Sequence, residues 1–167
     1  MRFTYCPHCG TKLIPRPIGD EGLVPYCDSC DKPLFDMFAT CIIVMVVNEE
    51  EEVALLQQNY LSSRHRVLVS GYMKPGESAE ECTRREVLEE IGIRLDSVEI
   101  VGTDWFGKRD QLMIGFVGRA KKAPFTISGE VDDVSWVPVE EAPALMSPGK
   151  SISTELVRRY LRERSKE

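Results

Sequence analysis

Two groups of residues in this chain have types and spacings that could support chemistry: a set of glutamates and four paired cysteines. Glu86, Glu89 and Glu90 follow a Ser78-x-x-Glu81 pattern with the form of a capping box, so we expect a helix to begin there. Helical residues at i, i+3 and i+4 share one face, where three carboxylates repel one another. Hard oxygen ligands at this spacing suit Mg²⁺ or Mn²⁺. A solvated, charged surface helix is the alternative interpretation.

The cysteines form two C-x-x-C pairs separated by seventeen residues: Cys6 and Cys9, then Cys27 and Cys30. Each pair can place two thiolates on one metal ion, so the two pairs predict a structural Zn²⁺ site with four thiolate ligands. Disulfides and a redox-active dithiol are the alternatives. His8 is expected to be an exposed loop residue, because the four thiolates already complete a ligand set. Cys41 and Cys82 are predicted to be small, buried hydrophobic residues.

The segment that must position the paired cysteines differs from the rest of the chain. The first 38 residues contain four of the six cysteines and five of the ten prolines, and no amphipathic helix of useful length fits them. So short a segment has too few apolar residues to fold without a staple, meaning a bound metal ion or a covalent cross-link. We therefore expect a small metal-stapled module at residues 1–37 and a second domain at residues 38–167.

The second segment mixes strand and helix patterns. Apolar runs rich in β-branched residues predict strands at residues 39–48, 53–60, 66–72, 96–104, 111–121 and 130–137. We expect the first two strands to form a hairpin, because an acidic turn joins them. Helical patterns occupy residues 78–91, 138–146 and 153–164, with Pro143 a candidate interruption of the second. Strands mixed with helices predict an α/β domain with a mixed sheet.

Composition narrows the class of protein. Of the 167 residues, 43% are hydrophobic and 29% are charged, which is normal for a globular protein. The longest apolar run, residues 41–47, is too short to span a bilayer. A formal net charge of −6 argues against nonspecific binding to nucleic-acid phosphates. Because no secretory signal is visible at the N-terminus, we expect a cytoplasmic protein without a membrane partner.

The glutamates belong to a longer pattern. Residues 71–93 read GYMKPGESAEECTRREVLEEIGI. This stretch resembles the Nudix box at every defining position: G, five residues, E, seven residues, R-E-apolar-x-E-E-x-G-apolar. The resemblance extends from about residue 38 to the C-terminus and implies an α/β/α sandwich with a mixed sheet. It also implies a catalytic set in which three glutamates bind the divalent metal and two further residues hold the box in place: Glu86, Glu89 and Glu90, then Arg85 and Glu77.

Other features resemble the NADH and NAD-cap pyrophosphatases of this family, in which a four-cysteine zinc ribbon directly precedes the Nudix domain. This resemblance implies a further metal ligand at Glu130 and a homodimer. It also implies three substrate-binding aromatic residues, Tyr72, Trp105 and Phe106, with Tyr72 directly after the box glycine as a stacking platform. The family's NADH signature, S-Q-P-W-P-F-P-x-S, is only partly matched, because residues 103–111 read TDWFGKRDQ and lack its prolines.

We therefore expect a hydrolase, dependent on Mg²⁺ or Mn²⁺, that cleaves the pyrophosphate bond of a small molecule in which a nucleoside diphosphate is linked to another moiety. NADH-like, NAD-like or ADP-ribose-like substrates are favoured, and the Zn²⁺ is structural. Two alternatives remain open. One is a nucleotide-sensing or protein-docking module with a Nudix fold and a zinc ribbon. The other is a Nudix hydrolase of nucleoside triphosphates or nucleotide sugars. An intact set of box glutamates favours hydrolysis over sensing.

Overall fold

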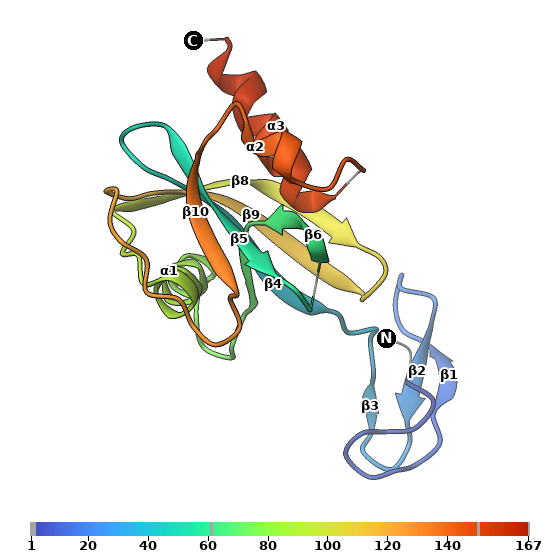
Figure 1. The fold of residues 1–167 in the computed structure, drawn as a ribbon. Coiled ribbons are helices and arrows are strands. Elements are labelled where there is room, and N and C mark those ends of the chain that lie inside the picture. Colours follow the sequence, from blue (N-terminus) through green and yellow to red (C-terminus); the bar gives the residue numbers. More distant parts are fainter. Residues whose placement is uncertain (1–2, 61, 150, 167) are drawn as a thin grey trace. The chain divides into compact units, whose positions relative to one another are not determined.

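The computed structural model describes residues 3–60, 62–149 and 151–166 (Figure 1). Its contacts divide the chain into two compact units, Met1–Phe38 and Ala39–Glu167. The first unit carries the paired cysteines, and the second carries the glutamate-rich helix. Within the described ranges, no helix is both long enough and apolar enough to cross a membrane.

The first unit is a small sheet of three antiparallel strands, in the order β1 (Ile14–Pro17), β2 (Leu23–Cys27) and β3 (Lys32–Pro33). A tight turn follows the first cysteine pair, where Gly10 donates its N–H to the carbonyl oxygen of Cys6. Gly10 has a φ of 74°, a left-handed conformation that glycine adopts without strain. Among the described residues of this unit, the buried hydrophobic side chains are only Cys6, Val24 and Cys27. So small an apolar core agrees with the expectation that this segment needs a staple.

The second unit is built on a seven-stranded mixed sheet. Its strands are β4 (Ala39–Val47), β5 (Glu52–Gln58), β6 (Ser62–Val67), β7 (Val69–Tyr72), β8 (Ser97–Phe106), β9 (Gln111–Arg119) and β10 (Asp133–Pro138). The main order is β10-β5-β4-β9-β8, while β6 pairs with β5 and β7 pairs with β4. The β4–β9 pair is parallel, and the other pairs are antiparallel. The predicted mixed sheet is confirmed.

Helices cover both faces of this sheet (Figure 1). On one face, α1 (Ala79–Ile91) packs through Val87 and Ile91 against a core that includes Ile42 of β4. On the other face, α2 (Ala142–Leu145) and α3 (Ile152–Arg164) share a core with Ile43 of β4. Alternate residues of β4 therefore serve two cores, which explains its long apolar run. The α/β/α sandwich is confirmed.

Four local predictions were wrong in detail. The strand expected at residues 66–72 is two strands, because the chain leaves β5 and turns at the buried Leu68 to pair with β4 instead. Pro143 lies in the first turn of α2 and does not interrupt it, since a missing N–H costs nothing there. The strand expected to end at residue 104 continues to Phe106, and the one expected to begin at residue 130 begins at Asp133.

Candidate active site

The helix α1 is fixed at both ends by local interactions. The predicted capping box is confirmed: Ser78 Oγ accepts a hydrogen bond from the N–H of Glu81, and the Glu81 carboxylate accepts one from the N–H of Ser78. Gly92 ends the helix with a φ of 72° and donates its N–H to the carbonyl oxygen of Leu88. These ends set where the helix starts and stops, and so which of its residues face β7.

Arg85 links the loop before α1 to the helix itself. Its Nε and Nη2 atoms donate to the two carboxylate oxygens of Glu77, at 2.9 and 2.6 Å, which is a bidentate ion pair. Its Nη1 donates to Glu86 at 2.5 Å and to Glu89 at 3.1 Å, and its Nη2 also reaches the carbonyl oxygen of Tyr72 at 3.2 Å. Hydrogen bonds, the strongest from Arg85, lower the pKa of Glu77 to about 2. One guanidinium therefore connects β7, the loop and α1.

Gly71 of β7 lets the carboxylate of Glu86 lie directly against the strand. A Cβ atom at position 71 would lie 2.1 Å from Cδ and 2.3 Å from Oε1 of Glu86, closer than non-bonded atoms can approach. Pairing with Ile42 of β4 holds Gly71 in the sheet. The strand therefore has little freedom to move away from the helix, and a glycine is required.

Glu90 is a buried carboxylate with one oxygen atom that lacks a hydrogen-bond partner. The residue is 8% exposed, and its Oε2 atom makes no hydrogen bond within the described part of the chain. Burial, together with the nearby charges of Glu86, Glu130 and Glu89, raises the pKa of Glu90 to about 8. A buried, unpaired carboxylate costs free energy in its ionised form. A cation bound beside Glu90 would remove that cost.

These residues line a cleft of about 450 Å³. The lining combines acidic, basic and aromatic side chains: Glu86, Glu89, Glu90 and Glu130; Lys74, Arg85 and Arg109; Tyr60 and Tyr72. Carboxylates can bind a cation, the basic groups can contact anionic oxygens, and a tyrosine ring can stack on a planar group. The cleft can therefore accept an anionic ligand that carries a ring and binds together with a metal ion.

The glutamate set fits a hard divalent cation in its chemistry, because it offers only oxygen ligands and one of them, Oε2 of Glu90, is unsatisfied. The geometry is not yet that of a closed metal site. Within the described ranges, no three of these glutamates bring carboxylate oxygens within 4.8 Å of one another. The Arg85 guanidinium occupies the space between Glu86 and Glu89, with which it is paired.

Of the site residues predicted outside α1, some line the cleft and others do not. Tyr72 and Glu130 line the cleft together with the box glutamates. Trp105 and Phe106 are not among the described residues that line it. Trp105 is exposed near the end of β8, and Phe106 packs against the core on the α3 face.

Several residues that line the cleft were not predicted to belong to the site, among them Tyr60, Lys74 and Gln111. Tyr60 follows β5, and Gln111 begins β9. The order of strands in the sheet brings them to the box, and no local spacing signals that order. Lys74 lies within the box itself, but a single lysine in a loop is no signal on its own.

The four paired cysteines converge. Their Sγ atoms all lie within 4.8 Å of one another, with 3.5 Å between Cys9 and Cys27 and 3.9 Å between Cys6 and Cys30. Thiolates at 2.3 Å from a tetrahedral Zn²⁺ lie about 3.8 Å apart, so the donor set and its spacing fit this ion. Hydrogen bonds with Thr11 lower the pKa of Cys9 to about 6, whereas the hydrogen bond with Cys9 and burial raise the pKa of Cys30 to about 12. A metal ion bound by all four thiols would therefore have to displace a proton from Cys30. Cys41 and Cys82 are buried, as predicted.

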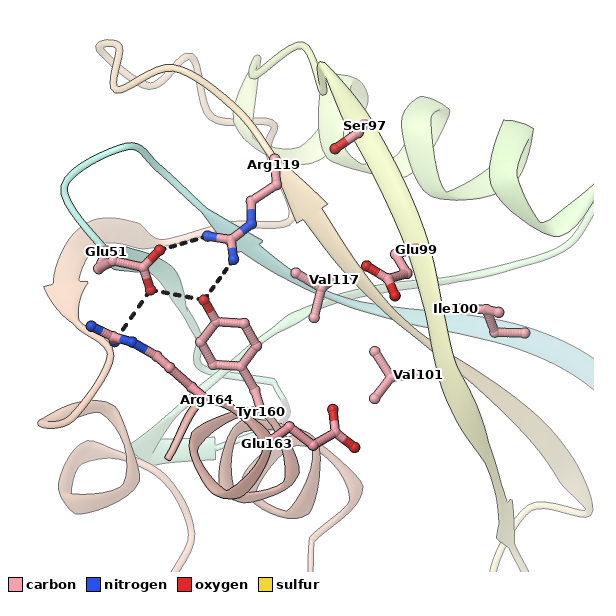
Figure 2. Close-up of a pocket in the computed structure, with 10 residues that line it drawn as sticks. All are labelled: Glu51, Ser97, Glu99, Ile100, Val101, Val117, Arg119, Tyr160, Glu163 and Arg164. Carbon is pink, nitrogen blue, oxygen red and sulfur yellow. Dashed lines mark hydrogen bonds and ion pairs between the residues drawn. The ribbon is translucent and has the colours of Figure 1, made fainter. Parts of the chain in front are cut away.

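A separate cavity of about 520 Å³ lies between β8, β9 and the end of α3 (Figure 2). The ionic groups at one end of it are paired with one another. Glu51 accepts hydrogen bonds from Arg119 and from the hydroxyl of Tyr160, each at 2.8 Å, and it pairs with Arg164 at 3.2 Å. The cavity contains no box residue. We interpret this network as a structural link between the β4–β5 turn and α3.

The family model described as NUDIX domain matches residues 37–160. The chain is 29% identical over 164 residues to a protein named NAD-capped RNA hydrolase NudC from Pseudomonas syringae pv. tomato. That match covers 96% of this chain and 56% of the relative, so the chain spans little more than half of the relative's length.

Solved structures show the same fold. A NUDIX hydrolase from Nitrosomonas europaea superposes with a TM-score of 0.74 at 20% identity, covering 98% of this chain and 93% of that one. A MutT protein from Methanosarcina mazei Go1 superposes with a TM-score of 0.63 at 26% identity, covering 78% of this chain and 98% of that one.

Proposed function

The chain belongs to the Nudix family, and we propose that it hydrolyses, with the help of a divalent metal ion, the pyrophosphate bond of a nucleoside diphosphate linked to another moiety. The observation that carries this proposal is the environment of Glu90. A buried carboxylate with an unpartnered oxygen lies in a cleft lined by three further glutamates. Such a group is costly unless a cation binds beside it.

Each box residue has a role in this proposal. Glu86, Glu89, Glu90 and Glu130 would hold the metal. Bound there, Mg²⁺ or Mn²⁺ would neutralise charge on the pyrophosphate oxygens and lower the pKa of a bound water. One of the glutamates accepts the proton of the attacking water as general base. The water oxygen forms a bond to one phosphorus, the bridging P–O bond breaks, and two monophosphates leave. Arg85 and Glu77 keep β7, the loop and α1 in register.

We propose a dinucleotide of the NAD type as the substrate class. Two tyrosines in the same cleft as the glutamates, Tyr60 and Tyr72, support a ligand with a planar ring. Lys74 and Arg109 line the same cleft and can contact phosphate oxygens. The name of the relative from Pseudomonas syringae, an NAD-capped RNA hydrolase, also supports a substrate of this chemistry.

We also propose that residues 1–37 form a zinc ribbon around one structural Zn²⁺ and that residues 38–167 form the hydrolase domain. The convergence of four Sγ atoms and the small apolar core of the first unit support this assignment. The two C-x-x-C turns would then replace the hydrophobic core that so short a segment lacks.

A panel of substrates tests the proposed activity. NADH, NAD⁺, ADP-ribose, an NAD-capped RNA, a nucleoside triphosphate and a nucleotide sugar are incubated with Mg²⁺, with Mn²⁺ and with a chelator, and the products are identified by mass. We expect NADH and NAD⁺ to yield AMP and the matching nicotinamide mononucleotide only when metal is present. Turnover of the triphosphate or the nucleotide sugar alone would reassign the substrate class. Binding without any turnover would contradict the proposal and support the sensing alternative.

A further inference from the structure

Metal binding does not account for one buried side chain in the cleft. Gln111, the first residue of β9, is 5% exposed, and its Nε2 atom donates a hydrogen bond to the Oη atom of Tyr72. Both residues line the cleft. Gln111 is the register partner of Ala39 of β4, and Tyr72 is the register partner of Cys41 of the same strand. The bond therefore connects β7 and β9 across β4.

This hydrogen bond restricts the Tyr72 ring. Tyr72 is 55% exposed, so about half of its surface is available for contact with a ligand. An exposed side chain loses rotamer freedom when a ligand packs on it, and this loss weakens binding. A hydrogen bond at the far end of the ring removes that freedom before the ligand arrives. The buried amide of Gln111 gains a partner in return, as buried polar groups require.

The direction of the bond decides what Tyr72 can offer a ligand. A tyrosine hydroxyl has one proton to donate and lone pairs that accept. Because Gln111 donates, the hydroxyl oxygen of Tyr72 accepts, and the hydroxyl proton is free to form a second bond. The ring thus combines a flat face for stacking with a donor at its edge. A planar ring with a carbonyl oxygen or a ring nitrogen at its periphery complements both features.

From this arrangement we propose that Gln111 is a positioning residue for substrate selection, acting through Tyr72. It favours nucleotides whose second group is a planar ring with a hydrogen-bond acceptor over nucleotides whose second group is a bare sugar. The inference rests on the proposed function, because it takes the cleft to be the substrate site.

A double-mutant cycle tests this role with two ligands that differ only in the ring. NAD⁺ carries a nicotinamide ring with a carboxamide, and ADP-ribose is the same molecule without that ring. The parent, Gln111→Met, Tyr72→Phe and the double variant are compared by kcat, KM and melting temperature. Methionine keeps the approximate size of glutamine, so Gln111→Met removes chiefly the bond to Tyr72. Phenylalanine keeps the ring, so Tyr72→Phe removes that bond together with the hydroxyl donor offered to the ligand.

We expect Gln111→Met and Tyr72→Phe each to raise KM for NAD⁺ roughly 3- to 10-fold, the range for one hydrogen bond, with kcat within about twofold of the parent. KM for ADP-ribose should stay at the parent value. Gln111→Met should add nothing in the Tyr72→Phe background, because its effect passes through the Tyr72 hydroxyl. An unchanged KM for NAD⁺, an equal change for both ligands, or additive effects of the two substitutions would overturn the proposal.

The failure of this inference differs from the failure of the proposed function. If the parent hydrolyses neither of these compounds nor any other member of the substrate panel, the proposed function is wrong. The same four proteins are then compared by the Kd of each compound in the presence of Mg²⁺, with the same pattern expected. Absence of binding to the parent would overturn the role of Gln111 as well.

Discussion

Arg85 and Glu77 form a bidentate ion pair across the loop that leads into α1, with N–O distances of 2.9 and 2.6 Å. The same guanidinium holds Glu86 and Glu89 and touches the backbone of β7. Loop, helix and strand therefore share one hydrogen-bonded centre. We infer that this centre maintains the spacing between β7 and the box carboxylates on α1.

Glu77→Gln should lower stability in a way that depends on pH. The pKa of Glu77 in the folded protein is about 2, below its ordinary value of 4.5, so its ionised form is favoured by folding. That contribution is complete above about pH 4.5 and disappears as the pH falls toward 2. Urea denaturation from pH 7 to pH 2.5 should show the parent more stable near neutrality and the difference shrinking in acid. Glu80→Gln, on the exposed first turn of α1, is the control. A difference that does not change with pH would contradict the ion pair's contribution.

Glu90→Gln should stabilise the metal-free protein at alkaline pH. The pKa of Glu90 in the folded state is raised to about 8, so folding favours its protonated form. The parent therefore loses stability as the pH rises from about 4.5 through 8, by an amount on the order of a few kcal/mol at most. The uncharged glutamine of the variant carries no such dependence. Melting temperatures in chelator from pH 5 to pH 9 measure this difference. Parallel pH profiles for the two proteins would show that Glu90 titrates normally.

Gly71→Ala should impair turnover by displacing Glu86. The new Cβ atom would overlap Cδ of Glu86, so the carboxylate or the strand must move. Such overpacking costs about 1–3 kcal/mol of stability. A displacement near 1 Å at a reacting centre lowers the rate roughly 100-fold. Gly149→Ala is the matched control, because its added Cβ meets at most one side-chain oxygen, at 4.0 Å. Rates equal to the parent in Gly71→Ala would show that Glu86 tolerates the shift.

Cys27→Ser should abolish zinc binding and unfold the first unit alone. Cys27 is fully buried among the converging thiols, whereas His8 lies in the same region but is exposed and outside the cluster. Elemental analysis should find about one Zn per chain in the parent and in His8→Ala, and much less in Cys27→Ser. Limited proteolysis should then cut Cys27→Ser within residues 3–38 and leave a fragment from about residue 39 onward. An ordered, protease-resistant first unit without zinc would refute the site.

Local signals explain what the sequence predicts well. The ends of α1 follow from Ser78, Glu81 and Gly92, which act within one turn of the chain. The spacing within each C-x-x-C pair places two thiols on one turn, and two such pairs predict the convergence of four thiols that the structure shows. Such features depend on spacing alone, and spacing is visible in a sequence.

Features that depend on how distant strands and helices pack together could not be predicted from the sequence. The contact between Gly71 and Glu86 depends on how α1 lies against β7, and the bond between Gln111 and Tyr72 depends on both strands pairing with β4. At Leu68 the chain stops pairing with β5 and begins to pair with β4, and no glycine or proline at this point of the sequence marks the change. Tyr60 reaches the cleft for the same reason, because strand order is a property of the whole sheet.

The rate of NADH hydrolysis in Mg²⁺ by the parent and by Glu86→Gln tests the central claim most directly. Glutamine keeps the size of the side chain and removes the charge that would hold the metal. We predict a loss of roughly two to four orders of magnitude in kcat with the fold retained, while Glu80→Gln, elsewhere on the same helix, keeps the parent rate. Hydrolysis by Glu86→Gln at the parent rate would contradict the assignment of the box carboxylates as the catalytic metal site.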